Sequence, residues 1–385
     1  SSSTIGMNPN LKPEKTSSIE AGFEAAFWDN RLYLDFTYYK TDSRNQILKL
    51  ATTAASGYTS QVRNAGHIRN RGYEIQLGAV PIQTSKGFRW NLDLNYGANS
   101  SKVVKLDDEG LITSYQLYSS GIQILASVGE AYGTLFGTSY VRDANGNVVV
   151  DANGLPKIST TNKTLGKFTP DWTGGISNTF SYRSLSLSFL IDASVGGSIF
   201  SNTNKTGKYT GVLANTLSGR DAEHGGLWYY TDAMGNNVRL SESPSYSVSS
   251  DGLYYAQVNG QSTRVYQDGI MVEGVTESGS KNEEVVSAEK YYHRIYSIAE
   301  ANVYDASYVK LREVALSYRL PRLWTQKLHL QEASVTLTGR NLWTIYKSVP
   351  NIDPESALTT GNAQGVEAYS LPTTRSFGVN LSVKF

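Results

Sequence analysis

The chain has 385 residues and an almost even charge balance, with 35 Lys and Arg against 34 Asp and Glu, a net charge of +1. Such a balance gives no extended positive field for binding nucleic acid. Cysteine is absent, which excludes disulfides, thiolate metal sites and cysteine nucleophiles, and the 4 His share no spacing that would suit zinc. Together with 26 Tyr and 35 Gly, this composition is typical of β proteins.

The sequence contains no candidate transmembrane helix, because no window approaches the ~18 consecutive apolar residues that such a helix needs. Residues 1–6 also lack the charged and apolar regions of a signal peptide, so we expect upstream sequence or a start that is not the natural one. The mean hydropathy of −0.34 does not exclude a membrane barrel. A transmembrane β-strand exposes only every second side chain to lipid, so its average hydropathy stays low.

Alternation of apolar and polar residues begins near the N-terminus. Ile19, Phe23 and Phe27 share one face of a predicted strand, and polar residues occupy the other face. Asp29 and Asn30 follow, and both residue types tolerate the positive φ of a tight hairpin turn. The sequence therefore predicts a long β-hairpin whose second strand starts near residue 32.

The same period-two pattern recurs to the end of the chain, and several runs reach the ~9–11 residues that a tilted strand needs to cross a bilayer. The runs are 73–79, 88–96, 172–182, 185–193, 314–320, 333–337 and 377–385. The faces opposite the apolar rows are polar but small, and we expect them to line the lumen of a barrel. These lumen residues are Thr173, Ser177, Thr179, Ser181, Ser186, Ser188, Ser334, Thr336 and Thr338.

Connections between the runs alternate in length, a pattern typical of outer-membrane barrels with short periplasmic turns and long extracellular loops. The short connections are 29–30, 81–87, 183–184 and 321–331, and the long ones are 43–66, 99–130, 196–305 and 346–371. To keep the strand directions consistent, we expect two further strands between residues 99 and 170, one of them near 131–141. The total is then about eleven antiparallel strands, whereas single-chain bacterial barrels have even numbers. The predicted fold class is therefore all-β, the C-terminal half of a large transmembrane β-barrel formed by residues 1–385, with 196–305 as its longest extracellular loop.

Several segments resemble the SusC/RagA-like branch of the TonB-dependent outer-membrane transporters. Residues 8–22, NPNLKPEKTSSIEAG, are similar to a mid-barrel segment of that family. The further matching segments are 64–66 (NAG), 70–74 (NRGYE), 128–133 (VGEAYG), 308–314 (YVKLREV), 316–321 (LSYRLP), 339–343 (GRNLW) and 353–355 (DPE). Each segment alone is weak, but the ordered set is specific and spans nearly the whole chain.

The resemblance implies a plugged barrel of ~22 strands in the outer membrane, of which this chain would supply the C-terminal part. It also implies the N-terminal half of the barrel, a SusD-like surface lipoprotein on the extracellular side, and the TonB–ExbB–ExbD motor acting through a plug that this sequence does not show. The family imports oligosaccharides in many members and peptides in some. The terminal Phe385 resembles the signal by which the barrel-assembly machinery recognises its clients.

Aromatic residues in the longest predicted loop are the candidate ligand-binding residues, because aromatic faces stack on sugar rings. The competing interpretation is that the loop packs on itself or on a cap protein. The candidates are Trp228, Tyr229, Tyr230, Tyr254, Tyr255, Tyr291 and Tyr292.

No catalytic constellation is apparent, and we predict neither an enzyme nor a cofactor. Acidic runs such as 107–109 fall in predicted loops, and the sequence shows no nucleophile elbow, phosphate loop or dinucleotide fingerprint. Residues 143–147 and 151–154 superficially resemble calcium loops, but the ligand spacing fails and Asn-Gly turns explain both. The alternative to a transporter is a soluble, surface-exposed β-sandwich or propeller that binds carbohydrate, and a lipid-facing barrel is distinguished from it by outward rows of Leu, Phe and Val that no second sheet covers.

Overall fold

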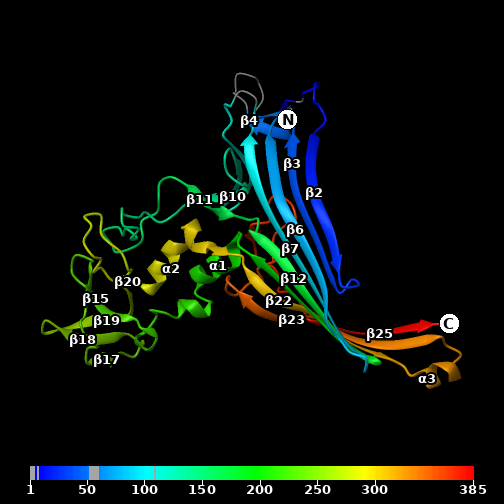
Figure 1. Cartoon of the computed structure of the whole chain (residues 1–385). Coiled ribbons are helices and arrows are strands. Elements are labelled where there is room, and N and C mark those ends of the chain that lie inside the picture. The colour runs from blue at the N-terminus through cyan, green and yellow to red at the C-terminus, as the bar shows by residue number, and fades with distance from the viewer. Residues whose placement is uncertain (1–4, 7, 52–59, 108–109) are drawn as a thin grey trace.

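The computed structural model describes residues 5–6, 8–51, 60–107 and 110–385. Its dominant feature is one curved antiparallel sheet of nine long strands (Figure 1). In spatial order the strands are β2 (Lys15–Phe27), β3 (Leu32–Arg44), β6 (His67–Gln83), β7 (Phe88–Lys105), β12 (Trp172–Tyr182), β13 (Leu185–Val195), β22 (Tyr308–Arg319), β23 (Glu332–Lys347) and β25 (Ser376–Lys384). Spatial order therefore follows chain order throughout the sheet, as in an up-and-down barrel wall.

The register places apolar and polar side chains on opposite faces of this sheet. Phe36 lies opposite both Phe23 and Ile75, and the apolar row continues across the sheet to pairs such as Leu316 with Leu187 and Leu337. The predicted lumen residues occupy the other face, where Ser181 lies opposite Ser186 and their hydroxyl oxygens are 3.0 Å apart. In the described residues no second sheet covers the apolar face, so the arrangement is a barrel wall and not the alternative sandwich.

One polar residue interrupts the apolar face. Asn178 is paired with Leu92 and Phe189, and it is almost fully buried. The indole Nε1 of Trp90 donates a hydrogen bond of 3.0 Å to Asn178 Oδ1. This satisfies the amide oxygen, which would otherwise be costly to expose to hydrocarbon.

The strand count of about eleven is corrected to nine. Residues between β7 and β12 contain four short strands, β8 (Ser114–Ser119), β9 (Gln123–Ser127), β10 (Tyr132–Gly137) and β11 (Lys163–Lys167), which pair with one another in a separate sheet. Strands of 5–6 residues are too short to cross a bilayer. Because β7 pairs antiparallel with β12, every short turn lies at one edge and every long loop at the other without two additional strands.

The tight turns form as predicted. Trp28, Asp29 and Asn30 have φ values of 53°, 56° and 62°, and Arg31 N donates to Trp28 O at 3.1 Å. The turn between β12 and β13 uses Arg183 at a φ of 54°. Asn and Asp adopt such left-handed conformations more readily than most residues, which is why the first turn was visible in the sequence.

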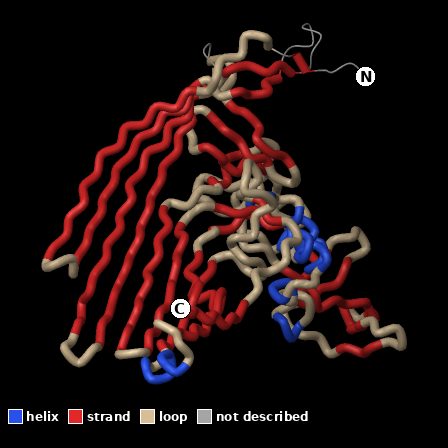
Figure 2. Tube along the Cα trace, turned by 90° about the vertical axis from the view of Figure 1, so that its right-hand side faces the viewer, coloured by secondary structure: helices blue, strands red, loops and turns tan. Residues whose placement is uncertain are grey.

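The long loops pack together beside the sheet into one body (Figures 1 and 2). Its buried residues Ile124, Leu135, Phe200, Ala299 and Val366 come from three different loops. Strands β14 (Ser198–Ser201), β21 (Val303–Asp305) and β24 (Val366–Glu367) join two of these loops in a small sheet. The loop segments are therefore a packed structure and not separate excursions.

The longest connection, between β13 and β22, has its own sheet and helices. Its strands are β15 (Leu227–Thr231), β16 (Asn237–Arg239), β17 (Tyr246–Val248), β18 (Tyr254–Val258), β19 (Gln261–Ile270) and β20 (Val286–Ser287). Its helices are α1 (Asn202–Thr210) and α2 (Ala288–Tyr296), with short 3-10 turns η2 (Ala214–Thr216), η3 (Ala222–His224) and η4 (Ala299–Asn302). The remaining elements of the chain are β1 (Ile5–Gly6), β4 (Ile47–Ala51), β5 (Ser60–Asn64) and α3 (Arg322–Lys327). Among the described residues, none of the helices is long and apolar enough to cross a bilayer.

Two edges of the nine-stranded sheet are open. Within the described residues β2 pairs only with β3, and β25 pairs only with β23. An unpaired strand edge in hydrocarbon leaves backbone N–H and C=O groups without partners, at a cost of several kcal/mol for each group. The sheet is therefore part of a barrel wall whose edges require further strands.

Candidate functional site: a cavity among the long loops

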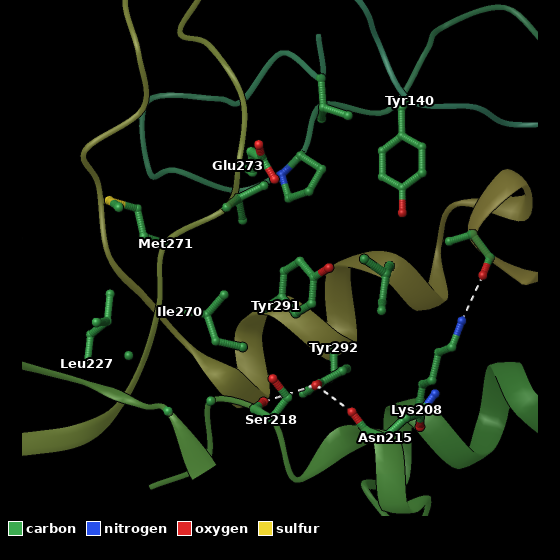
Figure 3. A pocket seen from close by; sticks show the side chains of 18 residues that line it. Tyr140, Lys208, Asn215, Ser218, Leu227, Ile270, Met271, Glu273, Tyr291 and Tyr292 are labelled. Atoms are coloured by element: carbon green, nitrogen blue, oxygen red, sulfur yellow. Dashed lines mark hydrogen bonds between the residues drawn. The ribbon is translucent and has the colours of Figure 1, made fainter. Parts of the chain in front are cut away.

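A cavity of about 710 Å³ lies within the loop body. Its walls come from the connection between β7 and β12, represented by Tyr140 and Pro156, and from the connection between β13 and β22. Figure 3 shows the lining side chains converging from these segments. A ligand in this space would touch parts of the chain that are more than a hundred residues apart in sequence.

Helices α1 and α2 form one side of the cavity, and both begin at serine N-caps. Ser201 Oγ accepts a 3.0 Å bond from Asn204 N, and Ser287 Oγ accepts a 3.3 Å bond from Lys290 N. Helix α1 ends at Gly211, whose φ of 69° allows the left-handed C-cap. These caps fix the two helices that carry Lys208 and the Tyr291-Tyr292 pair into the cavity wall.

Three tyrosines give the cavity an aromatic surface. The Tyr292 hydroxyl lies 3.0 Å from the backbone oxygens of both Asn215 and Ser218, which share its one proton, and this ties α2 to the segment that follows α1. Tyr140 and Tyr291 direct their hydroxyls toward the space in Figure 3, and neither hydroxyl has a hydrogen-bond partner in the described part of the chain. Burial raises the pKa of Tyr140, with smaller contributions from Tyr291 and Glu300. Both free hydroxyls therefore remain protonated and can donate or accept a bond to a polar ligand.

Lys208 is the buried cation of this site. Its Nζ donates 2.7 Å and 3.3 Å bonds to Ala301 O and Asn302 Oδ1, and the side chain lies 5.3 Å from the Tyr304 ring. Burial lowers the pKa of Lys208 to about 8. Burial therefore brings the titration of Lys208 closer to neutral pH than that of an exposed lysine.

The opposite wall is apolar. Leu227, Ile270, Met271 and Val272 line it, and Glu273 lies at its margin (Figure 3). The cavity therefore combines aromatic faces, free hydroxyls, a cation and an aliphatic surface. This arrangement can bind an amphipathic molecule but contains no paired carboxylates or activated nucleophile that would indicate a reaction.

The structure brings only two of the seven predicted aromatic residues into this cavity, Tyr291 and Tyr292. Trp228 and Tyr229 have 7% and 4% of their surfaces exposed. Trp228 packs on Ala256 and Val265, while Tyr229 stacks on Tyr266 at 5.0 Å and donates to Asp268 Oδ1 at 3.1 Å. Their positions match the interpretation that the loop packs on itself, because a side chain this buried has little surface left for a ligand.

The remaining aromatic candidates also lie in the β15–β19 sheet. Tyr230 and Tyr254 pack around the same small core as Trp228. Tyr255 is half-buried on β18, with Ser247 and Arg264 as its register partners. Ligand contact by these residues stays a prediction. Phe385 follows the last strand and is 83% exposed, and its role as an assembly signal also stays a prediction.

A second polar cluster, missed in the sequence, joins the loop body to the barrel wall. Lys310 Nζ, on β22, donates to Asp353 Oδ1 at 2.7 Å and to Glu355 Oε2 at 2.6 Å. Arg312 also pairs with Glu355, and its Nε donates to Asp192 Oδ1 on β13 at 2.7 Å. The register shifts at this point of β22, and such a bulge re-aims a side chain. The segments YVKLREV and DPE, noted only as family resemblance, thus meet in space.

The two candidate calcium loops are hydrogen-bonded turns. Asp143 Oδ1 accepts from Asn145 N and Asn147 N at 2.9 and 2.8 Å, and Gly146 has a φ of 87°. Asp151 Oδ1 accepts from Asn153 N and Leu155 N in the same way. In the described ranges no group of three His, Cys, Asp or Glu is placed to hold a metal.

Comparison with known proteins identifies the family. The model of the TonB-dependent receptor-like β-barrel family matches residues 1–248. The chain belongs to this family. Its sheet is accordingly an outer-membrane β-barrel wall, with the apolar face toward lipid.

Individual relatives agree with this assignment. The chain is 27% identical to TonB-dependent receptor P3 of Formosa agariphila, over 98% of this chain and 35% of that protein. It is 23% identical to TonB-dependent receptor SusC of Bacteroides thetaiotaomicron, over 98% of this chain and 32% of that protein. The solved RagAB peptide transporter superposes with a TM-score of 0.62 at 20% identity, over 98% of this chain and 36% of that one, and shows the same fold. The chain thus spans about a third of the length of these curated relatives.

Proposed function

We propose that this chain forms the C-terminal barrel wall and the ligand-receiving loops of a TonB-dependent nutrient importer. The observation that carries the proposal is the cavity of about 710 Å³ that two long loops enclose beside the barrel wall. A rigid barrel presents such loops as a packed body, and binding residues are commonly held on loops by a rigid scaffold. The proposal assigns no catalytic step to the chain.

The long-loop edge faces the cell exterior in this proposal, with residues 196–305 as the main extracellular segment. Outer-membrane barrels have short periplasmic turns and long extracellular loops, and all long connections of this sheet lie at one edge. A nutrient would therefore meet the cavity before it reached the lumen.

An oligosaccharide is the proposed ligand class, with a peptide as the alternative. Tyrosine faces and unpaired hydroxyls suit the alternating apolar and hydroxylated surfaces of sugar rings. The aliphatic wall of Leu227, Ile270 and Met271 would equally take apolar side chains of a peptide. The structurally similar RagAB is described as a peptide transporter, which is why the alternative belongs in the same experiment.

The partners that would supply energy for transport and cover the extracellular side of the barrel are proposed from the family. The barrel would be completed by N-terminal strands, closed by a plug that contacts TonB–ExbB–ExbD, and capped by a SusD-like surface lipoprotein. The resemblance to SusC and to RagAB supports these partners. The open edges of β2 and β25 support the need for further strands.

The test compares ligand binding by the full-length wild-type protein with binding by the double variant Tyr140→Phe, Tyr291→Phe. These changes keep both rings and remove only the two free hydroxyls, so each lost hydrogen bond should cost about 0.5–1.5 kcal/mol. Binding of a matching oligosaccharide should weaken about tenfold overall. Tyr115→Phe, in a half-buried tyrosine of β8 outside the cavity, is the matched control.

Panels of oligosaccharides and of peptides should be measured in parallel. Retention of full affinity by the double variant for every ligand that binds would contradict the cavity assignment. Binding of peptides alone would retain the cavity and replace the ligand class. Tyr255→Ala, at a predicted residue remote from the cavity, tests the competing surface on β18.

A further inference from the structure

A group of cations lies on the outward face of the barrel wall, directly beyond a row of aromatic rings. Tyr38, Tyr73 and Ala98 occupy one level of β3, β6 and β7, and Tyr96 stacks on Tyr73 at 6.0 Å. Aromatic rings at this position of a barrel mark the boundary between hydrocarbon and headgroups. The level next to them on the long-loop side therefore faces lipid headgroups.

The strand register places the cations at that level. Lys40 lies opposite Arg71, and at the next outward-facing position Asp42 lies opposite Arg69, which lies opposite Lys102. The 2.8 Å bond from Arg69 Nε to Asp42 Oδ1 confirms that these partners share one face. We call Lys40, Arg69, Arg71 and Lys102 the basic patch.

The basic patch carries more positive charge than its neighbours neutralise. Asp42 is the carboxylate among these outward positions, and it is already bonded to Arg69 and His67. In the described part of the chain Lys40, Arg71 and Lys102 form no ion pair. Their charges are therefore available to an external anion.

A groove of about 430 Å³ lies at the same place. Tyr38, Arg71, Tyr73 and Ser100 line it on the sheet, and Lys167 and Asp171 line it from the segment that leads into β12. Lys167 Nζ lies 2.7 Å from Asp171 Oδ1, which fixes this second wall. An anion in the groove would contact the Arg71 guanidinium with tyrosine rings beneath it, on a surface that no barrel strand can cover because it faces outward.

We infer that the basic patch and its groove bind the phosphorylated headgroup of an outer-leaflet lipid. Arginine matches phosphate geometry through paired N–H donors, and lysine adds charge. The tyrosine level would hold the start of the acyl chains, and the cations would hold the phosphate next to it. The site would fix one lipid against β6 and β7, close to the base of the loop body.

The experiment uses the native protein in phosphatidylcholine nanodiscs with and without phosphorylated lipid A. Lipid retained by the protein after detergent extraction is counted by native mass spectrometry. Each cation near a membrane surface contributes on the order of 1 kcal/mol, so Lys40→Gln with Arg71→Gln should reduce lipid A affinity roughly thirtyfold. Arg89→Gln, a cation on the lumen face of β7, is the matched control and should retain wild-type affinity.

Three outcomes would overturn the inference. The double variant could retain as much lipid A as the wild type, or the control could lose as much as the double variant. Displacement of lipid A by inorganic phosphate alone would assign the groove to a free anion instead of a headgroup. Thermal unfolding of the double variant and of the control is measured in parallel, which distinguishes a loss of lipid A affinity from a loss of folding.

Discussion

The barrel wall and the loop body follow different rules of construction. In the wall, each strand has a lipid face and a lumen face, so the residue types alternate strictly and the structure is visible in the sequence. In the loop body, short strands and helices from distant segments share small cores, such as the one around Phe200 and Val366. The wall is thus held by repeated pairing of strands that follow one another in the sheet, and the body is held by specific contacts between different loops. Substitutions in one region should therefore destabilise that region and leave the other intact.

The largest expected effect is on the core of the loop sheet. Trp228→Ala should cost about 3–5 kcal/mol, because it removes a buried ring that contacts Ala256 and Val265 and stacks on Tyr246 at 5.1 Å. Hydrogen exchange should accelerate at β15, β18 and β19 while the wall stays protected. Trp324→Ala, in the exposed helix α3, should change stability by no more than about 0.5 kcal/mol. Equal acceleration in the wall would show that the two regions are not separate.

The contact between the two regions should be almost as sensitive. Lys310→Met removes a cation whose side chain is only 4% exposed, leaving Asp353 without its ion-pair partner and Glu355 with Arg312 alone as a cation partner. This should cost about 3–5 kcal/mol. Limited proteolysis should then cut residues 348–375 faster. Arg340→Met breaks an exposed pair with Glu313 and should cost at most about 1 kcal/mol. Unchanged proteolysis of Lys310→Met would mean that the ion pairs do not hold this loop.

The wall itself should tolerate charge on one face only. Leu94→Arg faces lipid between Leu77 and Ile176 and should cost about 2–4 kcal/mol of folding free energy in bilayers. Asn95→Arg, the next residue, faces the lumen and should cost far less. The two variants are compared by urea unfolding in vesicles. The folded fraction is read from the heat-dependent mobility of the protein on a gel. Similar losses for both would contradict the assignment of faces.

The smallest effect of this series is expected from acid, which should weaken the ion pairs of Asp353 and Glu355 with Lys310 and Arg312. Burial disfavours ionised Asp353, but hydrogen bonds from Lys310 and Thr373 outweigh it and hold its pKa below the usual 3.8. The pKa of Glu355 is likewise lowered from 4.5, because bonds from Arg312 and Lys310 outweigh the effect of burial. A carboxylate whose pKa is lower in the folded than in the unfolded protein stabilises the fold at pH values above the unfolded pKa. This stabilisation is lost as the pH falls through and below about 4. Exchange of residues 348–375 should rise over that range, and Asp353→Asn should remove part of the dependence.

Sequence alone determined the wall. The alternating runs, the Asp29-Asn30 turn and the sorted loop lengths follow from local rules with a period of two, and the structure confirms them. The predicted number of wall strands was wrong because, in the described residues, β8 to β11 pair with one another in a separate sheet and do not join the wall. Alternation identifies a strand but does not show which sheet it joins.

The cavity and the ion-pair cluster around Lys310 are visible in the folded structure alone. Aromatic residues in the longest loop all looked alike in sequence, yet Tyr291 and Tyr292 line the cavity and Trp228 is buried in a core. Tyr140 comes from another loop altogether, and Lys310 meets Asp353 only after the chain folds back on β22. Such contacts depend on loop closure and side-chain packing between distant segments, and no periodic pattern records them.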